Sequence, residues 1–495
     1  MAYLQFPLLI LFILLLGAVM TPLLMKRFNL KGKYFILTVL IASLSLSAYL
    51  LFQVMTQGSY MYNIGNWSPT IGIQFSVDEF STMMVFFILM MTTLVVIYSL
   101  RDIEHEILPK QIPVYYSLIF LLLVGMVGIT FTNDLFNTYV FMEILAMTSC
   151  AIISIKRKKE NFMAAFKYLM LNTLASISFL FGVALLYMAT GYLNITEMSN
   201  QMAIAWEMYP TNILLALGFM AAGLGIKAAV FPLHTWLPDA HSSAPTPSSA
   251  LLSGLVVKVY IFVAMKVLFR LVGTEIIIVN LGVHNYIAYF AAVGMIMGSI
   301  FAIGQKDIKR MLAYSSVAQL GYIFLGIGMA TTQGLSVSLF HVVSHGLMKS
   351  ALFLSAGAII YKTEKRKIND LSGIGYEMPL TMIVFSIAAL GMIGIPGMSG
   401  FMSKWYLALA VLESNQPFYL VVILLSSFLN AVYYLPIIVA AFLKPREDGS
   451  EEMTRDGIPR TMTMPMVIIA GLIILVGIFP QILMNIIERA VPTFL

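Results

Sequence analysis

The sequence predicts an all-α protein that crosses a membrane many times. Hydrophobic residues make up 60% of its 495 residues and charged residues only 11%, whereas a soluble domain carries about 25% charged residues. The apolar residues form long solid runs and lack the alternation of a β-barrel strand. Because a helix needs about 20 residues to cross the hydrocarbon core, these runs allow about fourteen transmembrane helices.

The predicted transmembrane segments follow one another along the whole chain. They lie near residues 5–25, 34–54, 79–100, 112–131, 134–155, 162–190, 210–233, 246–270, 286–304, 308–330, 334–361, 379–411, 417–443 and 464–488. The first run is too long for the apolar part of a signal peptide and no basic region precedes it, so we expect a retained helix. The single Cys150 excludes an internal disulfide and a cysteine-based metal cluster.

Basic residues occupy every second connection between these segments. They are Lys26, Arg27, Lys31 and Lys33; Arg101 and Lys110; Lys156 to Lys159; Lys306, Lys309 and Arg310; Lys362, Lys365, Arg366 and Lys367; and Lys444 with Arg446. Connections 55–78 and 191–209 contain no Lys or Arg. The positive-inside rule therefore predicts cytoplasmic basic connections and two external termini. The formal charge of +6 then reflects topology and not nucleic-acid binding.

Proline and glycine interrupt the seventh and twelfth segments, at 223–232 and 391–400. Proline removes a backbone donor and glycine weakens a helix, so both segments are predicted to be broken helices. Paired broken helices are typical of transporters built from inverted repeats. We expect two five-helix repeats, 112–270 and 286–443. Residues 1–111 would form the first three helices, and 444–495 a cytoplasmic loop and the last helix.

Ionisable residues stand inside the apolar segments, where each costs about 3 kcal/mol on insertion scales. They are Glu143, Lys227, Lys258, Lys349 and Lys404, with His341 and His345 beside Lys349. A chain that accepts this cost repeatedly is predicted to move charge across the membrane, and groups that hold or release protons indicate proton transfer.

The order of these residues predicts a first pair and a relay. Glu143 has no cation within a turn or two on its own helix, so its partner must come from another helix, and Lys227 is the candidate. A structural ion pair is the alternative. Lys258 lies deep in its helix, whereas Lys266 and Arg270 lie near its end and are interpreted as interfacial anchors.

A four-residue spacing places His341, His345 and Lys349 on one helical face. We interpret this stripe as a proton relay between Lys258 and Lys404. Core histidines bonded to backbone carbonyls are one alternative, and a zinc site is another, although no acidic or Cys ligand accompanies the pair. For Lys404, beside Trp405, the alternative is an interfacial lysine.

The polar connections carry further candidates. Asp134 is predicted to cap the helix that follows it. His234, Asp239 and His241 lie in the polar stretch after Pro232 and are candidates for proton uptake from the cytoplasm. The connection with Lys306, Asp307, Lys309 and Arg310 reads as a solvated turn.

Several long motifs resemble the proton-translocating family shared by respiratory complex I and Mrp-type antiporters. They are residues 227–241, 244–254 with Lys258, 307–316 and 341–353. The resemblance implies that Glu143 and Lys227 form one half-channel pair, that Lys258 connects them through the helix of His341 and Lys349, and that Lys404 holds the last charge. The M-type subunit of complex I has a glutamate at that last position. Residues 397–407 look most like the D-type component of Mrp antiporters.

The resemblance implies a proton-translocating subunit of a multi-subunit sodium/proton antiporter in a bacterial or archaeal plasma membrane. Its partners would be other Mrp subunits. Because the membrane body of this chain holds few acidic groups for a sodium site, we expect the sodium path in a partner subunit. The alternative is an N-type subunit of complex I or of a membrane-bound hydrogenase, while a structural scaffold would not need charges at mid-membrane. We expect a transporter subunit, not an enzyme, with no cofactor, metal or nucleic acid.

Overall fold

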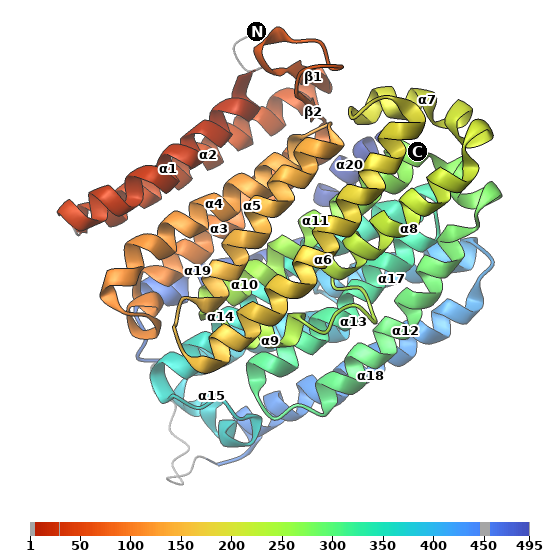
Figure 1. Ribbon diagram of the computed structural model, residues 1–495. Helices are drawn as coiled ribbons and strands as arrows, with labels where there is room; N and C mark the ends of the chain where they lie inside the picture. Colours follow the sequence, from red (N-terminus) through yellow and green to blue (C-terminus); the bar gives the residue numbers. More distant parts are fainter. Residues whose placement is uncertain (1–4, 29, 446–455, 495) are drawn as a thin grey trace.

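The structure is a computed structural model that describes residues 5–28, 30–445 and 456–494, almost entirely as helices. Helices run side by side through the molecule, and the start of the first helix lies at the same end as the last helix (Figure 1). Arg446 of the predicted basic clusters lies outside the described residues, as do the side chains of Arg27 and Lys31.

Over the described residues, twenty α-helices make up most of the fold. They are α1 (Phe6–Phe28), α2 (Leu30–Gln57), α3 (Glu79–Glu106), α4 (Ile112–Phe131), α5 (Leu135–Ser154), α6 (Lys159–Thr190), α7 (Ile195–Met208), α8 (Pro210–Lys227), α9 (Leu237–Ser243), α10 (Thr246–Leu251), α11 (Val257–Met265), α12 (Val283–Ile303), α13 (Ile308–Gly328), α14 (Thr332–Thr363), α15 (Ile374–Glu377), α16 (Pro379–Ile393), α17 (Ser399–Glu413), α18 (Pro417–Leu443), α19 (Arg460–Ile478) and α20 (Gln481–Ala490). The remaining helical elements are short. Four are 3-10 turns, at Ile64–Asn66, Pro109–Gln111, Ile368–Leu371 and Val491–Thr493. Three are π-helical turns, at Leu252–Val256, Lys266–Val272 and Ile276–Asn280.

The fold confirms a polytopic all-α membrane protein. Among the described residues, thirteen helices are long and apolar enough to cross a membrane. Each coincides with one predicted segment, and the remaining segment, 379–411, is divided into α16 and α17. The last predicted segment is wrong at its end, because Pro480 cannot continue α19 and the chain begins the separate helix α20.

The connections at one end contain structure that the hydropathy pattern did not predict. Strands β1 (Tyr60–Asn63) and β2 (Gln74–Val77) pair antiparallel, with Tyr60 opposite Val77. Helix α7 fills the connection between α6 and α8. Both lie at the end of the molecule where α1 starts, opposite the connections rich in lysine and arginine (Figure 1). We call the end formed by connections 155–159, 304–310 and 362–367 the basic end.

Both predicted helix breaks are present. Helix α8 stops at Lys227, and Trp236 Nε1 donates to the carbonyl of Ile226 at 2.8 Å, which satisfies an acceptor near the break. Helix α16 stops at Ile393, and Gly394 has a φ of 96°, which favours glycine. The division into two inverted repeats, 112–270 and 286–443, stays a prediction.

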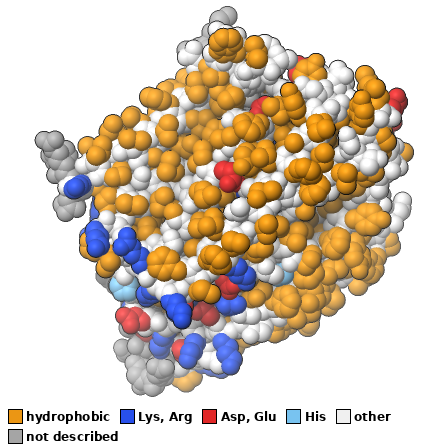
Figure 2. All heavy atoms as spheres, in the orientation of Figure 1, with side chains coloured by type: hydrophobic (Ala, Val, Ile, Leu, Met, Phe, Trp, Pro, Cys, Tyr) orange, Lys and Arg blue, Asp and Glu red, His pale blue; other side chains and the backbone are white. Residues whose placement is uncertain are grey.

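Helix α14 lies at the centre of the bundle. Every residue from Gly334 to Ile359 is buried, and α14 contacts α3, α10, α13, α16, α17 and α19. The span Thr246–Val272 and helix α13 are buried to a similar degree, whereas outer helices such as α1, α6 and α18 expose apolar side chains. The face drawn in Figure 2 is accordingly hydrophobic over most of its area, with basic side chains gathered toward one end. The innermost helices therefore carry the polar residues.

Candidate functional site

The first predicted pair comes together between α5 and the broken end of α8. Glu143 Oε1 lies 3.7 Å from Lys227 Nζ, and the Ser176 hydroxyl donates to the same carboxylate. The Lys227 side chain is buried, with its Nζ 5.4 Å from the centre of the Tyr260 ring. Within the described part of the chain this Nζ has no hydrogen-bond partner. Glu143 is thus the counter-charge of a buried lysine.

Lys258 occupies a distorted part of its helix. It follows the π-helical turn Leu252–Val256, and its ammonium donates to the carbonyl of Ser253 in that turn. Such π turns occur often at functional sites, because they change the regular hydrogen-bond pattern. The backbones of this turn and α14 approach closely at Gly254 and Gly346. Lys258 is therefore held beside the central helix.

The stripe lies on one face of α14, as its spacing predicted, and it is fully buried. The rings of His341 and His345 stack with centroids 5.8 Å apart and planes 8° apart. Lys349 donates to the carbonyl of Leu312 at 2.6 Å and to the hydroxyl of Ser315. Charge on Lys258 acts on both His345 and Lys349. Among the described residues no group of three His, Cys, Asp or Glu could hold a metal.

Lys404 lies against the second helix break. Its Nζ donates to the carbonyls of Met392 and Ile393, at 2.7 and 3.1 Å, and to the hydroxyl of Ser427 at 3.1 Å. These carbonyls end α16 and carry the negative pole of its dipole, which favours a cation. The side chain is buried, so the alternative of an interfacial lysine is wrong.

Aromatic and hydroxyl groups join Lys404 to the stripe on α14. The Lys404 ammonium lies 4.6 Å from the centre of the Tyr322 ring, and that ring lies 5.7 Å from the ring of His341. His341 Nδ1 is 2.8 Å from the hydroxyl of Ser403, the residue before Lys404. The space between the side chains of His341 and Lys404 is therefore lined by aromatic and hydroxyl groups.

Buried polar atoms without a protein partner gather in and around these residues. Of the described residues, they include His341 Nε2, both ring nitrogens of His345, and the hydroxyls of Ser344 and Ser350. Buried polar groups seldom lack a partner, and ordered water is the usual one when protein supplies none. These groups can therefore accept or donate through water.

The three candidates for proton uptake differ in position. Asp239 lines a pocket of 1210 Å³ at the basic end and pairs with Lys167 at 2.7 Å and Arg310 at 3.2 Å. His234 and His241 are buried, and His241 belongs to the short helix α9 and not to a polar loop. Burial and the charges of Lys258, Lys349 and Lys309 hold the pKa of His241 well below its usual range. His241 therefore lies between the basic end and the lysines of the centre.

The prediction of a solvated turn is wrong for Lys309. This side chain is 2% exposed, and its Nζ donates to the carbonyl of Ala244 at 2.7 Å. Asp102 and Glu106, one turn apart on α3, lie near it, and Glu106 pairs with Lys156 and accepts from the backbone of Thr246. The four-residue spacing of the two carboxylates was the signal that could have identified this buried cluster.

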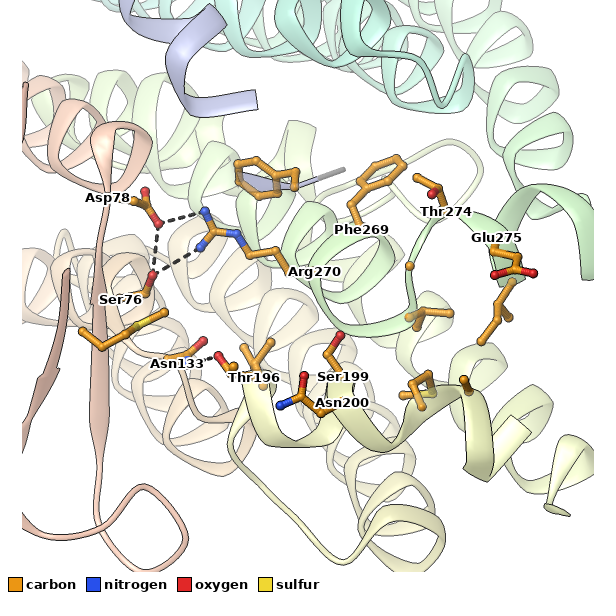
Figure 3. Close-up of a pocket in the computed structure, with 18 of the residues that line it drawn as sticks. Ser76, Asp78, Asn133, Thr196, Ser199, Asn200, Phe269, Arg270, Thr274 and Glu275 are labelled. Atoms are coloured by element: carbon orange, nitrogen blue, oxygen red, sulfur yellow. Dashed lines mark hydrogen bonds and ion pairs between the residues drawn. The ribbon is translucent and has the colours of Figure 1, made fainter. Parts of the chain in front are cut away.

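The prediction of an interfacial anchor is wrong for Lys266, whereas the half-buried Arg270 lies near the end of its span. Lys266 is buried and donates to the carbonyls of Ile129, Thr130 and Thr132 at the end of α4. Arg270 pairs with Asp78 at 2.8 Å beside a pocket of 760 Å³ at the end opposite the basic end (Figure 3). Asp78 also caps α3, and the Arg270 guanidinium helps to hold the pKa of this buried carboxyl below its usual value.

The chain is similar to components of large membrane complexes. Residues 132–430 match the family described as "NADH:quinone oxidoreductase/Mrp antiporter, TM". The N-type component of the NADH-quinone oxidoreductase of Desulforudis audaxviator is 35% identical, over 98% of each chain. The D-type component of the Na(+)/H(+) antiporter of Alkalihalophilus pseudofirmus is 30% identical, over 88% of this chain and 86% of that protein. A chain of the membrane-bound sulfane sulfur reductase, an archaeal respiratory membrane complex, superposes with a TM-score of 0.90 at 28% identity, covering 99% of this chain and 98% of that one.

The break beside Lys404 generates a prediction about Gly394. A Cβ at this position would lie 3.1 Å from Lys404 Cδ, in a backbone conformation that L residues rarely adopt. We expect Gly394→Ala to lower the free energy of unfolding by about 1–3 kcal/mol, seen as a lower Tm of the purified protein. The matched control is Gly471→Ala on α19, where a Cβ meets nothing within 4 Å. Equal losses of Tm in the two variants would contradict this assignment.

Proposed function

Because the chain belongs to the NADH:quinone oxidoreductase/Mrp antiporter family, we propose that it is the proton-translocating subunit of a multi-subunit membrane complex. The observation that carries this proposal is a set of ionisable groups that begins at the half-buried Glu143 and continues through the buried Lys227, Lys258 and α14 to Lys404. Ionisable groups inside a membrane are costly and mark ion or proton pathways.

Glu143 and Lys227 form the first gate. The carboxylate stabilises the buried ammonium, so protonation of Glu143 leaves that charge without its counter-ion in a low dielectric. Lys227 then gives up its proton more readily. Conversely, a charge that leaves Lys227 favours proton uptake by Glu143. This coupling converts a change in charge into a proton transfer, with the hydroxyls of Tyr168 and Tyr260 beside the pair.

The relay consists of Lys258, His345, Lys349 and His341. Lys404 is the second gate. Imidazole is the side chain whose ordinary pKa is closest to neutral, so it can both accept and donate a proton. The ring nitrogens of His345 are free of protein partners among the described residues and can exchange protons through water. His234, Asp239 and His241 would supply protons from the basic end. The repeats 112–270 and 286–443 would then each hold one gate.

Glu143 also indicates where a partner subunit binds. Its side chain is 26% exposed and shares one face of α5 with the exposed residues Phe136, Val140 and Met147. A carboxylate that faces hydrocarbon is unfavourable, so a neighbouring subunit should cover it. This geometry supports a hetero-oligomer, in keeping with the large complexes of the related chains. Under the positive-inside rule the basic end faces the cytoplasm of a prokaryotic cell and the termini face outward.

Two driving reactions are candidates. Sodium/proton antiport is supported by Lys404, by the Mrp-like stretch 397–407 and by the 30% identical D-type antiporter component. A redox-driven pump is supported by the 35% identical N-type component and by the superposition on an archaeal respiratory complex. Everted vesicles with the assembled complex distinguish the two reactions. Antiport dissipates an imposed pH gradient when Na⁺ is added, whereas a redox pump acidifies the vesicle lumen only when an electron donor is supplied.

We expect Glu143→Gln to lower proton translocation by about tenfold or more, equivalent to at least about 1.4 kcal/mol of lost charge interaction. The measurement is the pH response of everted vesicles that hold the assembled complex, with either driving reaction. Glu143→Asp keeps the carboxylate and should retain part of the activity. The control is Glu207→Gln, an exposed carboxylate on α7. Full translocation in Glu143→Gln would exclude the first gate.

The relay generates a separate prediction. His345→Asn keeps a polar side chain but cannot titrate near neutral pH, so we expect translocation to fall by about tenfold or more. Lys258→Ala should also lose activity. The control is His105→Asn, since His105 is exposed at the end of α3. If Lys258→Ala is inactive but His345→Asn keeps the full rate, the proton path bypasses α14.

A further inference from the structure

The pocket beside Asp239 at the basic end is strongly cationic. Its volume is 1210 Å³, and seven lysine and arginine side chains line it against three carboxylates. Lining residues come from the connection before α6, from α6 itself, from α9, from the connection before α13 and the first turn of α13, and from the connection after α14. Segments far apart in the sequence thus supply positive charge to one place.

Ion pairs within the pocket leave several of these cations unneutralised. Two carboxylates are engaged: Asp239 pairs with Lys167 and Arg310, and Asp307 pairs with Arg366 at 3.0 Å. Three exposed lysines of the lining have no ion-pair or hydrogen-bond partner for their ammonium groups among the described residues: Lys158, Lys306 and Lys367. One lining carboxylate, the exposed Glu160, stands outside these pairs. The unpaired charge of the pocket is therefore positive.

The same pocket has an apolar wall. Met163, Phe166 and Met170 of α6 line it and are 63%, 61% and 50% exposed. Their spacing places them on one side of α6, an outer helix that presents apolar residues to the surroundings. In Figure 2 the basic side chains border a broad hydrophobic face. The pocket thus offers cations at the membrane surface and an apolar groove below them.

We propose that this pocket binds an anionic phospholipid. The headgroup phosphate lies among Lys158, Lys306 and Lys367, and an acyl chain runs along Met163, Phe166 and Met170. Basic pockets at the cytoplasmic surface of transmembrane helices are suited to anionic headgroups. The apolar wall favours a lipid over free phosphate, because free phosphate has no apolar part that could contact this wall. Lipid binding here does not depend on the proposed translocation of protons.

The test uses the assembled complex in detergent and a phosphatidylglycerol that carries a photoreactive diazirine in one acyl chain. Mass spectrometry of the digested protein then locates the label. We expect cross-links on α6 between Phe162 and Leu171. Phosphatidylcholine with the same chains and probe should label this stretch much less, because its headgroup carries no net charge.

The variant Lys158→Gln/Lys306→Gln/Lys367→Gln should lower the α6 label by about tenfold or more, since each surface cation contributes to anionic-lipid binding. The matched control, Lys159→Gln/Lys444→Gln/Arg460→Gln, removes the same charge from exposed residues outside the pocket lining and should keep the label. Equal Tm values and subunit content show that both variants remain assembled.

Three results would overturn the proposal. The first is equal labelling by the phosphatidylcholine probe, or an unchanged label in the pocket variant. The second is full competition by millimolar inorganic phosphate, which would identify a site for the free anion. The third is no label on α6 of the complex together with cross-links from this stretch to another subunit, which would show that a protein partner covers the pocket.

Discussion

The structure depends on holding ammonium groups inside an apolar helical bundle. Lys227 has a carboxylate nearby, but Lys258, Lys349 and Lys404 rely on backbone carbonyls and hydroxyls. Carbonyl dipoles stabilise a cation less than a full negative charge does. Strong ion pairs would hold each proton in place, whereas purely apolar surroundings would keep every lysine neutral. In the proposed mechanism, this mixture of partners allows a proton to move.

The irregular segments of the helices supply the backbone carbonyls that hold the buried lysines. Where α16 stops at Ile393, its last carbonyls become available to Lys404, and the π turn before α11 offers the Ser253 carbonyl to Lys258. Irregular backbone at membrane depth is tolerated only inside protein or beside water. Here α14 and the helices around it surround the irregular segments. Backbone irregularity and buried charge therefore support each other, which explains why proline and glycine stand near the lysines in the sequence.

Hydropathy and proline positions were enough to predict the transmembrane segments, both breaks and the Asp134 cap, because length and backbone chemistry decide them locally. The spacing of His341, His345 and Lys349 likewise predicted one stripe on a single helical face. Lys266 and Lys309 were misjudged because their distance from a helix end suggested solvent, while neighbouring helices decide burial. His241 was assigned to a loop for the same reason. Tertiary packing, which the sequence pattern does not contain, separates buried from solvated charges near the ends of helices.

The proposed function requires a continuous polar path from Lys227 to Lys404, and direct observation of ordered water tests that continuity. A cryo-EM map of the assembled complex, at a resolution that shows ordered water, should reveal hydrogen-bonded waters that link Lys227 to Lys258, then to His345 and on to Lys404. A wide dry gap between any two of these side chains, or a Lys404 ammonium that points to lipid headgroups, would contradict it.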